Sequence, residues 1–188
     1  MKLLPTRSVK DKVKAAVAAH FNLDNSKLFL SHPTFFSELT AVPAVTPHDE
    51  YWHDHIDKET YPSFHYTSLL YLSEYKRDFA GGRFVFFFFQ CSFCIDMYVL
   101  SSVKIRFMFI DEGSKLNRSI EPKDGRVSAF TSGPENRHMV EPVTGGTRYH
   151  ILSSLHSYTY HSDNSRYALT MGFTCNPDEA IADPGTST

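Results

Sequence analysis

Three potential metal ligands and one further carboxylate lie within five consecutive residues, in the run His53-Asp54-His55-Ile56-Asp57. In an extended segment, side chains two positions apart point to the same side, so His55 with Asp57, or His53 with His55, can bind one ion. The His-x-Asp pattern is weak evidence by itself, because histidine and aspartate also meet by chance in solvated loops. The run predicts a metal site only if further ligands lie elsewhere in the sequence.

Two residues far downstream complete such a site. His138 offers another imidazole, and Arg148 follows it behind Gly145-Gly146-Thr147. Two histidines and one carboxylate on adjacent strands form the facial triad that binds non-haem Fe(II) and leaves three positions open. A buried arginine can bind a carboxylate through two parallel hydrogen bonds and keeps its charge. The combination predicts an iron site that uses a 2-oxo acid and dioxygen (O2).

Four stretches around these residues carry a family resemblance. They are His55-Ile56-Asp57, residues 66–72 (YTSLLYL), Gly81-Gly82-Arg83-Phe84 and residues 138–149 (HMVEPVTGGTRY). Together they resemble the prolyl 4-hydroxylase-like Fe(II)/2-oxoglutarate dioxygenases, over most of residues 8–184. The resemblance implies a mainly β, double-stranded β-helix (jelly-roll) fold with an N-terminal supporting helix. It also implies dependence on Fe(II), 2-oxoglutarate and L-ascorbate (vitamin C).

The resemblance further assigns roles to single residues. His55, Asp57 and His138 match the catalytic iron ligands, and Arg148 matches the basic residue that binds the distal carboxylate of 2-oxoglutarate. Tyr71 matches a tyrosine that hydrogen-bonds the same carboxylate, and an ordinary core tyrosine is an equal interpretation. The family is anchored in a membrane by a single span, so this chain would be the soluble domain, with the span not present in it.

One helix and many short strands would position these residues. Ser8 as N-cap and the apolar periodicity after it predict a helix to about His20. Phe35-Phe36, after Pro33, is an apolar cluster outside the predicted strands. Alternating or apolar runs bounded by turn residues predict short strands at 28–30, 67–72, 83–86, 126–130, 138–143 and 168–175. This order favours a β-sandwich or barrel with helical support.

Length and composition fit one domain that needs no disulfide bonds or structural zinc ion for stability. The chain has 188 residues, a formal net charge of −2, ten histidines and three cysteines. A chain of this length buries a real core, and the near-neutral charge argues against nucleic acid as a partner. Residues 84–100 approach the length of a membrane span, but Gln90 and Asp96 inside the stretch argue against that interpretation.

The expected organisation is helical support over residues 1–45, the dioxygenase domain over 46–176 and a loose tail over 177–188. Two segments, 87–109 and 150–167, interrupt the family pattern. They resemble translated intron sequence, and functional loops such as a lid are the alternative. The second ends in Arg166-Tyr167, which repeats Arg148-Tyr149. Spacing from His138 therefore selects Arg148 for the carboxylate, whereas continuity with the last strand selects Arg166.

The sequence predicts an Fe(II)- and 2-oxoglutarate-dependent dioxygenase that hydroxylates a residue of a protein or peptide, proline by analogy with the family. One alternative is a catalytically dead isoform or binding protein disrupted by its inserts. Another is a zinc hydrolase with His53, His55 and His138 as ligands, against which Arg148 argues. Consumption of 2-oxoglutarate with Fe(II) but not with Zn(II) would separate the three.

Overall fold

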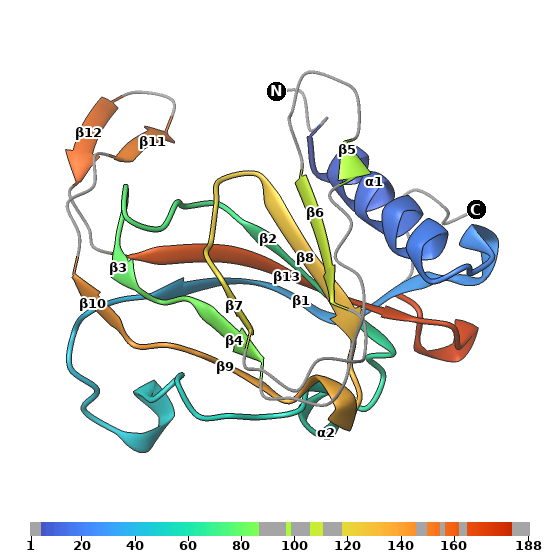
Figure 1. Ribbon diagram of the computed structural model, residues 1–188. Helices are drawn as coiled ribbons and strands as arrows, with labels where there is room; N and C mark the ends of the chain where they lie inside the picture. Colours follow the sequence, from blue (N-terminus) through green and yellow to red (C-terminus); the bar gives the residue numbers. More distant parts are fainter. Residues whose placement is uncertain are drawn as a thin grey trace.

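The computed structural model describes residues 5–86, 97–98, 106–110, 118–145, 150–154, 157–161 and 165–181. Helix α1 (Pro5–His20) packs on one face of the larger sheet, and a smaller sheet faces its opposite side (Figure 1). Between the sheets runs a second apolar layer, separate from the one beneath the helix. The fold is therefore three layers deep, as the mainly β prediction with one supporting helix requires.

Helix α1 buries one stripe of small apolar side chains. Val13, Ala16 and Val17 are 0–3% exposed and pack on the sheet, at the spacing expected of one helical face. The predicted end at His20 is confirmed, but an N-cap at Ser8 puts the first helical residue at Val9, four residues too late. Because the fixed φ and missing N–H of proline suit the first turn, the helix begins at Pro5 and Ser8 lies within it.

The larger sheet carries the long strands. Its order is β1-β13-β2-β8-β6-β5, antiparallel except where β6 pairs parallel with β8. Their bounds are β1 (Phe29–Leu39), β13 (Arg166–Thr174), β2 (Tyr66–Tyr71), β8 (Arg126–Thr131), β6 (Arg106–Ile110) and β5 (Met97–Tyr98). Alternation along β2 sends Leu70 toward α1, and Leu69 and Tyr71 toward the smaller sheet.

The smaller sheet closes the opposite face. It consists of β7 (Arg118–Ile120), β4 (Phe84–Phe86) and β9 (His138–Val140), all antiparallel. Phe84 and Phe86 pack against Phe130 of β8. The other elements are the pairs β3 (Ala80–Gly81) with β10 (Val143–Gly145) and β11 (His150–Ser154) with β12 (Ser157–His161), the helix α2 (Asp57–Thr60), and 3-10 turns at Asn25–Lys27, Pro47–Asp49, Pro134–Asn136 and Pro177–Glu179.

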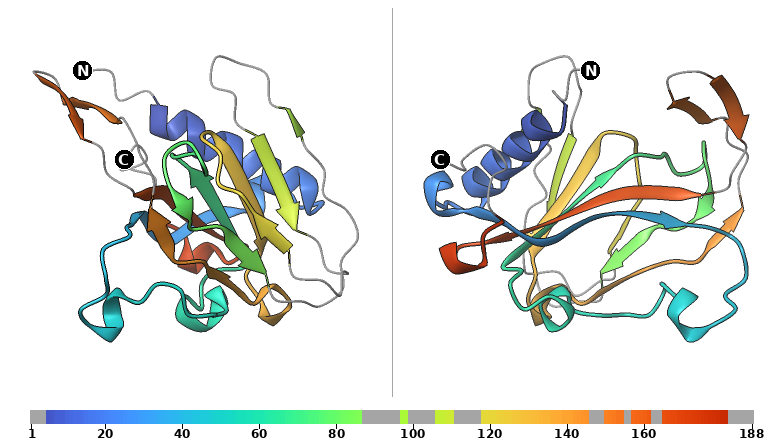
Figure 2. Two further views of the ribbon diagram at one scale, coloured as in Figure 1. Left: turned by 60° about the vertical axis from the view of Figure 1, so that its left-hand side comes forward. Right: turned by 180° about the vertical axis from the view of Figure 1, so that it is seen from behind.

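Strand β1 differs most from its prediction. The short strand expected at 28–30 is the beginning of an eleven-residue strand that includes Phe35 and Phe36. Its register with β13 shifts between Ser31 and Thr34, around Pro33. Because proline has no N–H to donate, an irregularity at this point lets the strand continue beyond it. Strands β1 and β13 run side by side along their length, as the view from behind shows (Figure 2).

The tail and the two interrupting segments are partly described. Ala180 pairs with Ser31, and the N–H of Ile181 donates to the carbonyl of Leu30 at 2.8 Å. Ala180 and Ile181, within the expected loose tail, therefore have backbone partners on strand β1. Residues 97–98 and 106–110 join the larger sheet, residues 150–154 and 157–161 pair with each other, and the remainder of both segments lies largely outside the described residues.

No helix in the described part of the chain is long and apolar enough to cross a membrane. Phe84–Phe86, which open the apolar stretch 84–100, form strand β4. The rest of that stretch, apart from residues 97–98, lies outside the described residues.

Candidate metal centre

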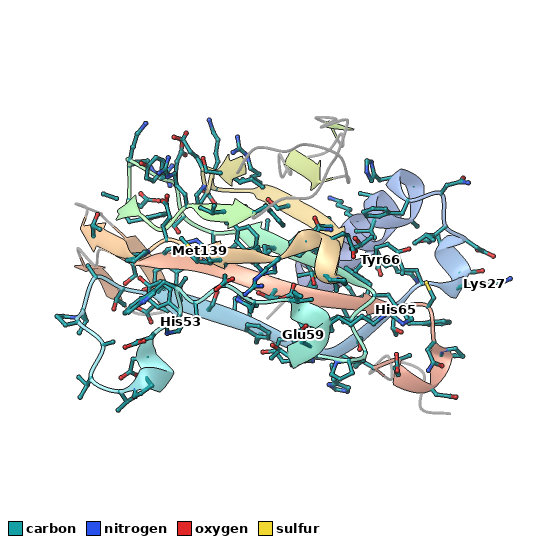
Figure 3. All side chains as sticks on the ribbon, turned by 60° about the horizontal axis from the view of Figure 1, so that its bottom comes forward. Lys27, His53, Glu59, His65, Tyr66 and Met139 are labelled. Atoms are coloured by element: carbon teal, nitrogen blue, oxygen red, sulfur yellow. The ribbon has the colours of Figure 1, made fainter. Side chains whose placement is uncertain are left out.

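Two histidines are brought together by the backbone. His138 begins β9, and the N–H and carbonyl groups of His55 and His138 exchange hydrogen bonds of 2.9 and 3.0 Å as an isolated antiparallel bridge. Asp57 then begins helix α2, so the chain turns immediately after His55. The segment that carries His55 and Asp57 runs along the side of the sheet that comes forward in Figure 3, where the neighbouring residues His53 and Glu59 are labelled.

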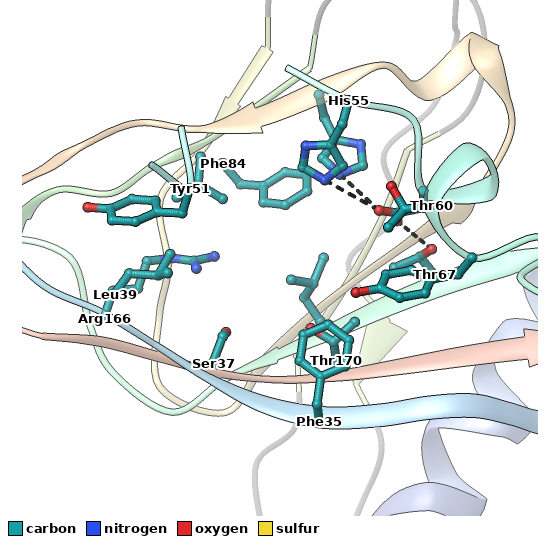
Figure 4. Close-up of a pocket in the computed structure, with 15 residues that line it drawn as sticks. Phe35, Ser37, Leu39, Tyr51, His55, Thr60, Thr67, Phe84, Arg166 and Thr170 are labelled. Atoms are coloured by element: carbon teal, nitrogen blue, oxygen red, sulfur yellow. Dashed lines mark hydrogen bonds and ion pairs between the residues drawn. The ribbon is translucent and has the colours of Figure 1, made fainter. Parts of the chain in front are cut away.

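His55, Asp57 and His138 form the one group of potential metal ligands found among the described residues. One ligand atom from each lies within 4.8 Å of the others. Asp57 Oδ1 is 3.5 Å from His55 Nε2 and 3.4 Å from His138 Nε2, and dashed lines mark these contacts in Figure 4. Bonds of about 2.1 Å place ligand atoms about 3 Å apart at right angles and about 3.4 Å apart at tetrahedral angles. The three side chains therefore lie close enough together to bind one metal ion.

Backbone carbonyl groups orient both imidazoles through their Nδ1 atoms. The Nδ1 atom of His138 lies 2.7 Å from the carbonyl of Asn136, and that of His55 lies 3.0 Å from the carbonyl of His53. A carbonyl only accepts hydrogen bonds, so each Nδ1 donates and each Nε2 keeps its lone pair for a metal. His138 is 2% exposed and stacks on Phe84 at 4.6 Å, whereas the side chain of His55 is 41% exposed.

Electrostatics favour an ionised carboxylate here. Burial alone would raise the pKa of Asp57, but hydrogen bonds with His138 and His55 outweigh burial and hold that pKa far below its usual value. The hydrogen bond with Asp57 raises the pKa of His55, against the effect of burial. The centre therefore carries a negative charge that stabilises a proton on His55 or a bound cation.

The three side chains open on a cavity of about 180 Å³ between the sheets. Its walls are mainly apolar and aromatic and include Phe35, Leu39, Tyr61, Leu69, Phe84 and Val140. Arg166, from the first position of β13, lines the same cavity and directs its guanidinium into it (Figure 4). The cavity thus contains two charged groups of opposite sign, the candidate metal centre with Asp57 and the guanidinium of Arg166.

Arg166 is buried without a full set of partners. It is 1% exposed, and its Nε and Nη2 atoms have no hydrogen-bond partner among the described residues. Burial lowers the pKa of this guanidinium, and Tyr71 partly opposes that shift. A buried, unpaired N–H group is costly, and an arginine fork matches a carboxylate. The arrangement is suited to an anionic ligand in the cavity.

Tyr71 lies behind this arginine. The guanidinium carbon of Arg166 lies 5.3 Å from the centre of the Tyr71 ring, within the range of a cation–π contact. Tyr71 is fully buried, its hydroxyl accepts a hydrogen bond from Ser128 at 3.2 Å, and burial raises its pKa. The geometry shows a buried core tyrosine that also contacts the arginine, and a hydrogen bond from Tyr71 to 2-oxoglutarate stays a prediction.

Two candidate site residues, His53 and Arg148, are not placed among the metal ligands or the cavity lining by the described structure. His53 pairs with Glu50 at 2.7 Å, and its side chain is 66% exposed. Arg148 lies outside the described residues. Tyr51 accepts a hydrogen bond from the N–H of Val143 at 2.7 Å and lines the cavity.

Sequence reasoning missed Thr67 and Thr170, which line the cavity as well. Alternation along β2 could have found Thr67, because it shares a face with Tyr71. No comparable signal marked Thr170, whose place depends on the register of β13.

Comparison with known proteins establishes the class. A model of the 2OG-Fe(II) oxygenase superfamily matches residues 41–171, so the chain belongs to that superfamily. The match and the two facing sheets confirm the predicted jelly-roll fold and the predicted family.

Particular relatives are similar over nearly all of the chain. Proteins named 2-oxoglutarate and iron-dependent oxygenase domain-containing protein 3 are 47% identical in Xenopus tropicalis and 44% in Homo sapiens, over 95% of this chain in both cases. The chain spans 43% and 42% of their respective lengths. Prolyl 3-hydroxylase 2 of Rattus norvegicus is 30% identical over 63% of this chain and 12% of its own length.

Proposed function

We propose that this chain is an Fe(II)- and 2-oxoglutarate-dependent dioxygenase that hydroxylates a residue of a protein or peptide substrate, such as proline. His55, Asp57 and His138 would hold the iron, and Arg166 would bind the distal carboxylate of 2-oxoglutarate. Bound iron supplies the oxidising chemistry, for which the cavity must leave coordination positions open to 2-oxoglutarate and O2.

The single observation that carries this proposal is the buried, incompletely paired guanidinium of Arg166 in the cavity of the three ligands. A zinc hydrolase needs a general base near its metal, and its bond-breaking step does not require such a clamp. A dicarboxylate that reaches from a metal to an arginine satisfies both polar features at once. Arg166 therefore replaces Arg148 as the proposed carboxylate ligand, in line with the continuity of the last strand.

The chain's own groups then divide the work. The hydrogen bonds that Nδ1 donates to backbone carbonyls hold the imidazoles of His55 and His138 with Nε2 toward the metal. Tyr71 supports the arginine fork from behind. Apolar walls keep water away, which strengthens the ion pair between Arg166 and a carboxylate. Each of these tasks is positioning or exclusion, which is the protein's share of the work in a cofactor enzyme.

The substrate end of the cavity is aromatic. The rings of Phe35 and Tyr61 lie 6.0 Å apart on the cavity wall, and Tyr61 in turn contacts Phe64 at 4.9 Å. Such a wall suits a compact apolar side chain, and a prolyl ring is one. The relative named prolyl 3-hydroxylase 2 supports the same choice of residue. Dependence on L-ascorbate and membrane anchoring through a span outside this chain follow only from the family resemblance.

The test is metal-dependent turnover of 2-oxoglutarate. Purified protein with Fe(II) should form succinate, should do so faster with poly(L-proline), and should form none with Zn(II). In a parallel anaerobic experiment, 2-oxoglutarate should raise the melting temperature of the metal-loaded protein. A protein that does not bind 2-oxoglutarate would show neither effect, and a dead isoform that binds it would show only the rise in melting temperature. Hydrolysis of a peptide with Zn(II), without succinate, would support the hydrolase alternative.

A further inference from the structure

We propose that Thr67 is a positioning residue that makes Asp57 a one-oxygen ligand of the metal. The inference rests on the proposed metal site and adds a residue that the family match does not assign. Thr67 lies on β2, ten positions after Asp57, and is 1% exposed. Its hydroxyl donates to Asp57 Oδ2 at 2.6 Å, and a dashed line reaches Thr67 in Figure 4.

Counting protons fixes the direction of a longer hydrogen-bond chain. Thr67 has one hydroxyl proton, which the ionised carboxylate of Asp57 accepts, because a carboxylate has none to give. The 2.8 Å contact between the Thr67 and Ser132 hydroxyls must then use the proton of Ser132. The hydrogen-bond chain therefore runs from the Ser132 hydroxyl to the Thr67 hydroxyl and on to Asp57 Oδ2. The first hydrogen bond polarises the Thr67 hydroxyl and so strengthens the second.

The hydrogen-bond chain divides the two oxygens of Asp57 between different tasks. Oδ2 receives the short, charge-assisted bond from Thr67, whereas Oδ1 lies 3.4 and 3.5 Å from the two Nε2 atoms. Only Oδ1 is thus directed at the position where a metal would sit. If both oxygens bound the metal, the carboxylate would occupy a further coordination position. Thr67 thereby keeps that position available for 2-oxoglutarate or O2.

The backbone fixes all three groups to one framework. The N–H of Lys58, next to Asp57, donates to the carbonyl of Ser132 at 3.0 Å, and the N–H of Ser132 donates to the carbonyl of His65 at 3.0 Å. Helix α2, the end of β8 and the start of β2 therefore cannot move independently. A hydroxyl held this rigidly can set the orientation of a ligand.

The experiment measures Mn(II) affinity of the purified chain, with free Mn(II) quantified by electron paramagnetic resonance. Thr67→Val keeps the shape of the side chain but removes the hydroxyl, and should raise the Kd for Mn(II) about ten- to hundredfold. Thr67→Ser retains the donor and should restore affinity to within about threefold of the original protein. A Kd for Thr67→Val equal to that of the original protein would overturn the proposal.

A matched control separates positioning from stability. Thr174 is also fully buried, and its hydroxyl donates to a carboxylate, that of Glu179, at 2.7 Å outside the cavity. Thr174→Val should lower the melting temperature as Thr67→Val does but leave Mn(II) affinity unchanged. Equal losses of affinity in both variants would overturn the positioning role.

The Mn(II) affinities of one further variant and of the original protein complete the test. If Thr67→Val does not fold, Ser132→Ala tests the same chain, and unchanged Mn(II) affinity in that variant overturns the proposal. Failure of the original protein itself to bind Mn(II) would instead refute the proposed metal site.

Discussion

Substitution of Arg166 by methionine tests the proposed co-substrate site most directly. Methionine fills most of the space of the arginine stem and removes only the charged fork, so packing and charge are separated. Arg166 contributes two N–H groups without partners among the described residues, Nε and Nη2. We expect Arg166→Met to bind metal normally and to lose affinity for 2-oxoglutarate.

The size of the loss follows from the buried contact. Hydrogen bonds to charged groups contribute about 1.5–3 kcal/mol, which is roughly a ten- to hundredfold change in Kd. The upper part of this range is expected, because Arg166 is 1% exposed and solvent screens the pair little. Removal of a buried charge that lacks partners should leave the melting temperature of the ligand-free protein unchanged or higher.

The assay is calorimetric titration of 2-oxoglutarate into the Fe(II)-loaded protein without oxygen. Arg166→Lys should recover only part of the affinity, because lysine keeps the charge but not the two-pronged geometry. Arg148→Met is the control and should bind 2-oxoglutarate like the original protein. Loss of binding in Arg148→Met with normal binding in Arg166→Met would refute the assignment and restore the register chosen by spacing from His138.

Three further predictions follow from the metal centre and the fold. His55→Ala should abolish Mn(II) binding while His53→Ala leaves it within a few-fold, and equal losses would contradict the ligand assignment. Gly172→Ala should lower the free energy of unfolding by about 1–3 kcal/mol in urea, because a Cβ there would lie 2.0 Å from the buried ring of Phe64. Deletion of residues 148–165 leaves the arginine at the start of β13 and should preserve 2-oxoglutarate affinity within a few-fold, and loss of binding would show that this segment is functional.

The local sequence is enough for much of the framework. The run of residues 67–72 predicts the strand, whereas the division of its side chains between two apolar layers comes from the structure. The helical spacing of Val13, Ala16 and Val17 predicts which face of the first helix is buried. Strand β1 was underestimated because Pro33 interrupts its pattern, and only pairing with β13 shows that the strand continues.

The sequence by itself determined the chemical types of the site: an imidazole and a carboxylate two positions apart, a distant second imidazole, and an arginine near the last strand. It could not choose between Arg148 and Arg166, because the same dipeptide, Arg-Tyr, occurs at both places. Tertiary structure decided which of the two begins β13, through the pairing of Arg166 with Leu39 and of Ala168 with Tyr71. Cross-strand hydrogen bonds set this register, and a shift of one residue would turn every side chain of the strand to the other face. The contact of Thr67 with Asp57 has the same origin, since it joins a strand to a helix that only the packed fold brings together.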